Sequence, residues 1–176
     1  MATISAGILA FRRKTHGVEF LLVHPGGPFF AKKDAGAWSI PKGVRDSAEG
    51  SLEAARREFA EETGVTLSGD ARDLGQFKQP SGKLIEAWLT EADLDTSTMS
   101  SNTFKLEWPP KSGKQQEFPE VDRYGWFKPD QALGKISKGQ VGIVKFAMEV
   151  LEVPQDMTSQ TVPSSPGPAD PQGSLF

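Results

Sequence analysis

The segment from Gly43 to Val65 constrains this chain more than any other part of its 176 residues. Residues 52–63 contain no Gly or Pro, Ser51 can serve as the N-cap, and Gly64 follows where a left-handed C-terminal residue is favoured. The pattern predicts one helix of about three turns. Its apolar residues fall on one stripe that can pack against a core. These residues are Leu52, Ala55 and Phe59.

Three carboxylates gather on a neighbouring face of the predicted helix. Glu58, Glu61 and Glu62 stand at i, i+3 and i+4, so their side chains converge. Like charges at this spacing repel in water, and more strongly when partly desolvated, which favours a cation between them. Hard oxygen donors indicate Mg²⁺ or Mn²⁺, and the chain has no cysteine that would favour zinc. Arg57 can pair with Glu61 at i+4, or fold back to orient a ligating glutamate.

A solvated surface helix is the alternative interpretation of a run rich in Glu and Arg. It does not explain the glycine and the glutamate that precede the helix, Gly43 and Glu49. With average residue usage, the joint pattern has a chance of order 10⁻⁷ or less in a chain of this length. The pattern comprises Gly43, Glu49, Arg57, Glu58, Glu61, Glu62, Gly64 and apolar residues at 59 and 65.

This segment resembles the Nudix box of the Nudix hydrolases, with Phe59 where a smaller aliphatic residue is commoner. The resemblance implies an α/β protein with the Nudix fold, an α/β/α sandwich around a mixed β-sheet. It also implies hydrolysis of a nucleoside diphosphate linked to another group. In the roles that it implies, Arg57 is an orienting partner and Glu49 a further ligand or a water-activating residue. The implied metal ligands are Glu58, Glu61 and Glu62.

The segment WSIPKG, over residues 38–43, resembles the branch of the family that contains dinucleoside tetraphosphate and diphosphoinositol phosphate hydrolases. Lys42 would then lie next to the metal site and meet a phosphate oxygen; a solvated loop lysine is the alternative. The run Ser5, Ala6 and Gly7 resembles the opening of the same branch, where a bare first strand lets substrate approach closely, so Ser5 is a candidate substrate contact. Pro80 instead resembles a proline of ADP-ribose pyrophosphatases, although a turn at a strand end explains it more simply.

A second acidic stretch precedes Trp126. In many Nudix enzymes a glutamate several residues before a strand tryptophan supplies an extra metal ligand or the general base. Glu120 has that placement and Glu117 is the second candidate, while Glu49 also remains open as the base. A solvated loop acid explains either residue equally well. Arg123 is a further candidate partner for phosphate.

The remaining pattern is consistent with the implied fold over a Nudix domain of residues 1–153. Apolar runs at 4–11 and 18–23 predict a hairpin around a Thr-His-Gly turn, and residues 141–150 have the spacing of a helix packed on a core. Further strands are predicted at 74–78, 84–89 and 124–127. Loops are predicted at 24–36 and 107–123.

Composition restricts the class of protein. With 37% hydrophobic and 24% charged residues, the chain is predicted to be one soluble domain. No apolar run approaches the ~20 residues of a membrane helix, and no signal pattern precedes the first strand. The absence of cysteine fits a reducing interior, so we expect a cytoplasmic protein. A net charge of −3 argues against an extended nucleic-acid surface. The family resemblance also allows a homodimer.

The last part of the chain, residues 154–176, changes character. It is rich in Pro, Ser and Gly and predicts a mobile tail or a coil laid on the surface. The terminal QGSLF resembles the peptide by which several bacterial DNA-maintenance proteins dock into the sliding clamp, although Gly173 replaces the usual leucine. An inert terminus is the alternative.

The resemblance and the residues together predict a metal-dependent hydrolase. It would cleave a pyrophosphate linkage in a nucleoside polyphosphate or dinucleoside polyphosphate, by attack of metal-activated water. The alternatives are an ADP-ribose, sugar-nucleotide or diphosphoinositol pyrophosphatase, and a non-catalytic module that binds a nucleotide. A non-catalytic module tends to lose box carboxylates, and this chain keeps them all.

Overall fold

The computed structural model describes residues 3–154. The predicted tail lies outside the described residues from position 155 onward, and so does the QGSLF segment. Both remain predictions.

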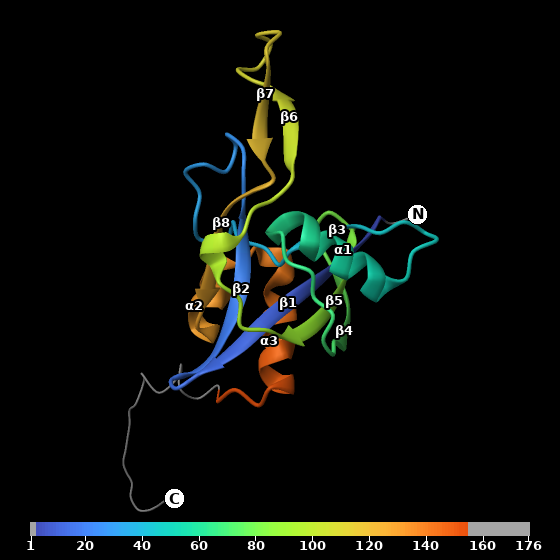
Figure 1. The fold of residues 1–176 in the computed structure, drawn as a ribbon, viewed down its shortest axis with the longest axis vertical. Helices are drawn as coiled ribbons and strands as arrows, with labels where there is room; N and C mark the ends of the chain where they lie inside the picture. Colours follow the sequence, from blue (N-terminus) through green and yellow to red (C-terminus); the bar gives the residue numbers. More distant parts are fainter. Residues whose placement is uncertain (1–2, 155–176) are drawn as a thin grey trace, which may run out of the picture.

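A mixed sheet forms the centre of the molecule (Figure 1). The first two strands form the predicted antiparallel hairpin, while β1 and β5 run parallel. The strand order is β4-β5-β1-β2-β8, and β3 pairs with β1 beside this path. The strands are β1 (Ile4–Lys14), β2 (Gly17–Pro25), β3 (Lys42–Val44), β4 (Arg72–Lys78), β5 (Leu84–Glu91) and β8 (Val121–Phe127).

Helices cover both faces of the sheet (Figure 1). Successive side chains of β1 point to opposite faces, so Ile8 packs against α1 (Ser51–Thr63) while Leu9 belongs to the core under α2 (Pro129–Lys135) and α3 (Val141–Val150). Two short 3-10 turns, η1 (Thr96–Thr98) and η2 (Lys138–Gln140), complete the helical elements of the described chain. The predicted α/β/α sandwich and the helix over 141–150 are confirmed.

The start of α1 differs from the prediction by one residue. Gly50, not Ser51, is the N-cap, and the Glu53 carboxylate accepts the Gly50 N–H at 3.3 Å. Ser51 is the first helical residue, and its hydroxyl accepts the Trp88 indole N–H at 2.9 Å instead of capping the helix. The other end is as predicted, since Gly64 has φ 78° and closes the helix in the left-handed conformation.

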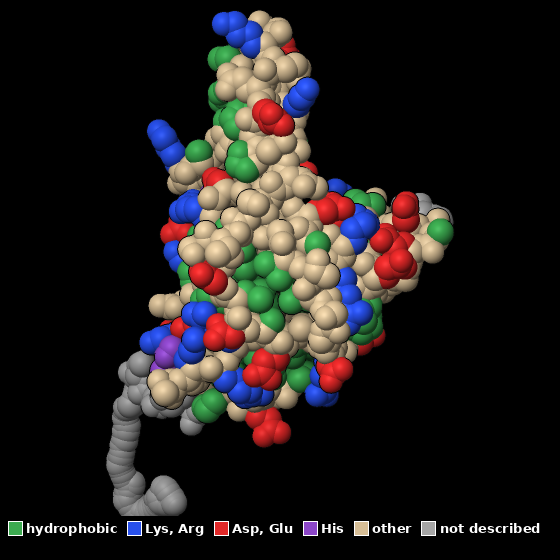
Figure 2. Space-filling view, viewed as in Figure 1, with side chains coloured by type: hydrophobic (Ala, Val, Ile, Leu, Met, Phe, Trp, Pro, Cys, Tyr) green, Lys and Arg blue, Asp and Glu red, His purple; other side chains and the backbone are tan. Residues whose placement is uncertain are grey.

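A second, two-stranded sheet was not predicted. β6 (Thr103–Glu107) and β7 (Gln115–Pro119) form a hairpin, here called the arm, which replaces much of the loop expected over 107–123. Figure 1 and Figure 2 show the arm standing out from the main body, with hydrophobic side chains along one side of it. The loop expected over 24–36 is also shorter, because His24 and Pro25 belong to β2.

Among the described residues, no helix is both long and apolar enough to cross a membrane.

Candidate functional site

Most of the predicted site residues lie around one cavity of about 480 Å³. β3 contributes Lys42 and Gly43, and Phe104 comes from β6. Pro25, the last residue of β2, and Gly26, which follows it, also line the cavity. The acidic residues that line the cavity come from α1 and from the junction of β7 and β8. They are Glu58, Glu61, Glu62 and Glu120.

Two glycines allow the backbone and the carboxylates to approach closely. A Cβ on Gly7 of β1 would lie 2.6 Å from the Pro41 carbonyl oxygen, so only glycine lets β3 pair with β1 at this point. A Cβ on Gly43 would overlap the Glu58 carboxylate. Gly43 therefore provides the space that the Glu58 side chain occupies.

Backbone hydrogen bonds hold Glu120 at the cavity. The Glu120 N–H donates to the Asn102 carbonyl at 2.9 Å, and the Asn102 N–H donates to the Glu61 carbonyl at 2.9 Å. The Gly26 N–H donates to the Glu120 carbonyl, also at 2.9 Å. This chain of bonds links β2, the base of the arm and α1, and so fixes an acidic residue beside helix carboxylates that are distant in sequence.

The cavity concentrates negative charge. Burial raises the pKa of Glu62 from 4.5 to about 8, with Glu58 and Glu120 adding repulsion and Lys42 opposing the rise. Burial also raises the pKa of Glu58; the hydrogen bond from Arg57 opposes this, and the charges of Glu61 and Glu120 add to it. A cation would relieve this repulsion.

Arg57 already neutralises part of the cluster. Its Nε and Nη2 donate to the two oxygens of Glu49 at 2.8 and 2.9 Å, and Nη1 donates to Glu58 at 2.8 Å and to Glu61 at 3.1 Å. The bidentate bond lowers the pKa of Glu49, and the same bonds raise the pKa of Arg57. The predicted pair with Glu61 is present, and the same guanidinium also binds Glu58 and Glu49.

The donor set fits a hard divalent cation by its chemistry. Glu58, Glu61, Glu62 and Glu120 offer carboxylate oxygens on one cavity, and the repulsion from Glu58 and Glu120 that adds to the raised pKa of Glu62 would be relieved by a cation. Within residues 3–154, no three acidic or histidine side chains converge on one point as they stand. In this arrangement Glu58 and Glu61 both accept hydrogen bonds from Arg57 Nη1.

Other predicted residues lie apart from the cavity lining. Glu49 faces Arg57, and Ser5 is buried on β1 opposite Val44 of β3. Arg123 lies on the face of the sheet that α2 and α3 cover, with its Cζ 5.5 Å from the Trp38 ring centroid. Glu117 is exposed on β7 and accepts the Thr103 hydroxyl. Of the two acids considered before Trp126, Glu120 is the one at the cavity.

Phe104 is a lining residue that the sequence analysis missed. It stands in the alternating run TFKLE, whose half-buried positions are Phe104 and Leu106. That period-2 pattern was the available signal, although it spans only one short strand.

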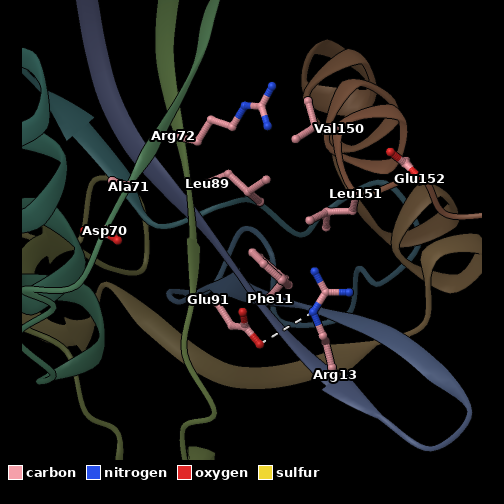
Figure 3. Close-up of a pocket in the computed structure, with 10 residues that line it drawn as sticks. All are labelled: Phe11, Arg13, Asp70, Ala71, Arg72, Leu89, Glu91, Val150, Leu151 and Glu152. Atoms are coloured by element: carbon pink, nitrogen blue, oxygen red, sulfur yellow. Dashed lines mark ion pairs between the residues drawn. The ribbon is translucent and has the colours of Figure 1, made fainter.

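A larger cavity, of about 550 Å³, lies at the other end of the sheet near the end of α3 (Figure 3). Arg13 and Arg72 flank it, and Arg13 pairs with Glu91 at 3.7 Å. Its apolar lining includes Phe11 and Leu89. None of the predicted site residues lines this cavity, so size alone does not identify the site.

Comparison with known families matches residues 1–147 to the NUDIX domain. Among curated proteins, the bis(5'-nucleosyl)-tetraphosphatases [asymmetrical] of Rattus norvegicus and Mus musculus are each 33% identical over 103 residues. The match covers 52% of this chain and 66% of each relative, so the chain spans just under two thirds of the length of these relatives.

Solved structures show the same fold. The NUDIX domain of Shewanella oneidensis NrtR, in complex with ADP ribose, aligns with a TM-score of 0.61 at 15% identity and covers 86% of this chain and 89% of its own. A binary complex of C. elegans Ap4A hydrolase aligns with a TM-score of 0.59 at 20% identity and covers 86% of this chain and 98% of its own.

Proposed function

The chain belongs to the NUDIX family, and on that premise we propose that it is a pyrophosphohydrolase acting on nucleoside polyphosphates or dinucleoside polyphosphates. The observation that supports this most is the meeting of four glutamates and one lysine on a single cavity. Hydrolysis of a pyrophosphate needs cations that neutralise the phosphate oxygens and a base that accepts the proton of the attacking water. The glutamates can bind divalent cations and accept that proton, and the lysine adds a positive charge.

The roles follow from position in the cavity. Glu58, Glu61 and Glu62 would hold Mg²⁺ or Mn²⁺, which when bound supplies charge neutralisation and a more acidic water. The Lys42 ammonium binds a phosphate oxygen at the rim. Glu120 takes the proton of the attacking water onto its carboxylate, because it lines the cavity and Glu117 does not.

The ion pair between Arg57 and Glu49 supports the site from outside the cavity lining. Two nitrogens of the Arg57 guanidinium donate to the Glu49 carboxylate, and the third nitrogen donates to Glu58 and Glu61. We propose that Arg57 sets the orientation of these two carboxylates and that Glu49 acts through it. Ser5 and Arg123 remain predictions as substrate contacts.

The curated relatives favour a dinucleoside polyphosphate as the substrate. Both are named as asymmetrical bis(5'-nucleosyl)-tetraphosphatases, and their 33% identity exceeds that of the aligned structures reported above. The segment that ends at Lys42 and Gly43 resembles the same branch of the family.

A substrate panel tests the proposal. The protein is incubated with Mg²⁺ and diadenosine tetraphosphate, ATP, ADP-ribose or a diphosphoinositol phosphate, and the products are separated by anion-exchange chromatography. We expect the tetraphosphate to be cleaved fastest, and Glu120→Gln to lower kcat by about 10²–10⁴-fold. Fastest cleavage of ADP-ribose or of the inositol compound would overturn the substrate, and no cleavage of any compound would favour a non-catalytic module.

The exposed Glu149→Gln on α3 is the matched control for loss of one carboxylate. It should leave turnover at the wild-type rate.

A further inference from the structure

One wall of the carboxylate cavity is aromatic and has no part in the proposed chemistry. Phe104, from β6 of the arm, lines the cavity together with Glu120. Its ring lies against the backbone of Gly27, where an added Cβ would be 3.0 Å from the ring Cζ. Gly27 has φ 96°, a conformation that favours glycine. The loop after β2 is therefore shaped to let this ring reach the cavity.

Backbone hydrogen bonds connect the base of the arm to the helix that bears the carboxylates. The Ser100 N–H donates to the Thr63 carbonyl at 3.2 Å, next to the bond already described between Asn102 and Glu61. The Ser101 hydroxyl accepts the Val121 N–H at 3.0 Å. Phe104 follows two residues after Asn102, so the backbone that carries its ring is connected closely to α1. A binding group placed in this way is preorganised.

Further aromatic side chains lie in the loop after β2 and between the two strands of the arm. Phe29 meets Trp108 edge to face, with ring centroids 5.4 Å apart, and yet Phe29 is 60% exposed. Phe30 is 38% exposed, with the Lys33 ammonium 5.5 Å from its ring centroid. Large aromatic side chains exposed on neighbouring segments are typical of a ligand-binding surface.

We infer that Phe104 is the stacking platform for the nucleobase of the substrate, whose phosphates lie at the neighbouring carboxylates and Lys42. This inference rests on the proposed function. The cavity volume of about 480 Å³ is in the range of small-molecule sites. Stacking on an aromatic ring is a large contribution that any base can make.

The lining also indicates how selective this platform is. The described residues that line the cavity include no Asn, Gln, Ser or Thr side chain, so no neutral hydrogen-bonding side chain reads the edge of the base there. The site should therefore select for an aromatic base and discriminate weakly between adenine and guanine.

A pair of non-hydrolysable ligands tests the inference without turnover. The ligands are α,β-methylene-ADP and methylenediphosphonate, which share the bridged phosphates and differ by the nucleoside. Dissociation constants are measured by isothermal titration calorimetry with Mg²⁺ for the wild type and for Phe104→Leu, which keeps apolar volume and removes the ring. We expect Phe104→Leu to raise the dissociation constant of α,β-methylene-ADP about ten-fold and to leave the dissociation constant of methylenediphosphonate unchanged. Phe104→Trp should retain the affinity.

Phe118 provides a matched control. It stands directly across the arm from Phe104, with ring centroids 6.0 Å apart, and it does not line the cavity. Phe118→Leu removes the same ring from the same hairpin and should change neither affinity. If Phe118→Leu and Phe104→Leu weaken α,β-methylene-ADP equally, Phe104 acts only through the stability of the arm and the inference is overturned.

The remaining outcomes separate the inference from the proposed function. The inference would be overturned if Phe104→Leu lost affinity for both ligands equally, or lost affinity for neither. It would also be overturned if the wild type did not bind α,β-methylene-ADP. These outcomes do not depend on which compound the enzyme hydrolyses. Ring-dependent binding by a protein that cleaves no pyrophosphate compound would support the platform and refute the proposed function. A hundred-fold preference between the ADP and GDP analogues would overturn the weak base selectivity.

Discussion

Replacing Glu62 with glutamine should stabilise the protein in the absence of divalent metal. The folded state raises the pKa of Glu62 from 4.5 to about 8, chiefly by burial. Between these two values the folded protein keeps a proton that the unfolded chain has released, so the free energy of unfolding falls as pH rises. Glutamine does not titrate, so this fall in the free energy of unfolding is absent in Glu62→Gln.

The interval between the two pKa values sets the scale of the effect. Each pH unit of this interval corresponds to about 1.4 kcal/mol, so above pH 8 the ionisation of Glu62 can lower the free energy of unfolding by at most about 5 kcal/mol. Solvent screening at a half-buried site and the nearby Lys42 charge reduce it, so we expect a gain of about 1–3 kcal/mol at pH 9. At pH 4.5 both side chains are largely neutral, and the two proteins should unfold at nearly the same urea concentration.

Urea denaturation in EDTA at pH 4.5, 7 and 9 measures this difference. The exposed Glu149→Gln is the control and should show no growth of the difference with pH. Saturating Mg²⁺ should then stabilise the wild type more than Glu62→Gln, because an ion that binds only the folded state adds to its stability. A variant that is no more stable than the wild type at pH 9, or a difference that does not grow with pH, would refute the burial argument.

Three further substitutions test how the site is built. Gly43→Ala places a methyl where the Glu58 carboxylate lies, so Mg²⁺ affinity measured by calorimetry should fall by about ten-fold or more while the urea midpoint changes little; unchanged affinity would contradict the role of this glycine. Gly7→Ala meets the Pro41 backbone oxygen instead, which cannot turn away, and should lower the free energy of unfolding by more than about 2 kcal/mol. Tyr124→Phe removes a 2.7 Å hydrogen bond to a carbonyl in the last turn of α1 and should cost about 1 kcal/mol in the same assay, where no loss would mean that water replaces the hydroxyl.

Local patterns in the sequence predicted the elements that depend on local physics. The period of 3.6 placed Glu58, Glu61 and Glu62 on one face of α1, and Gly64 marked the helix end. The apolar runs around residues 15–17 predicted the first hairpin. These signals suffice because they involve neighbours in the chain.

The arm and α2 escaped prediction for physical reasons. The alternation of apolar and polar residues in β6 is short, and β7 is mostly polar. Two prolines and a glycine between the strands predict a loop. α2 has only seven residues, starts at Pro129 and contains Gly134. α2 packs against β2, β8 and α3, which its own sequence pattern does not indicate, whereas β6 and β7 pair with each other.

The composition of the site depended on tertiary structure in the same way. Glu120 joins the α1 carboxylates through backbone bonds among three separate segments, and no spacing in the sequence encodes that. Likewise, the sequence allowed several partners for Arg57, and the fold shows that it binds Glu49 and two helix glutamates at once.

The rate of diadenosine tetraphosphate cleavage by the wild type and by Glu62→Gln, each with Mg²⁺ and with EDTA, tests the central claim most directly. If the glutamate cluster holds the metal that supports hydrolysis, the wild type should cleave the tetraphosphate only with Mg²⁺. Glu62→Gln should then lose at least about a hundred-fold in rate while unfolding at an equal or higher urea concentration. Cleavage at the same rate by both proteins, or undiminished cleavage in EDTA, would contradict the account.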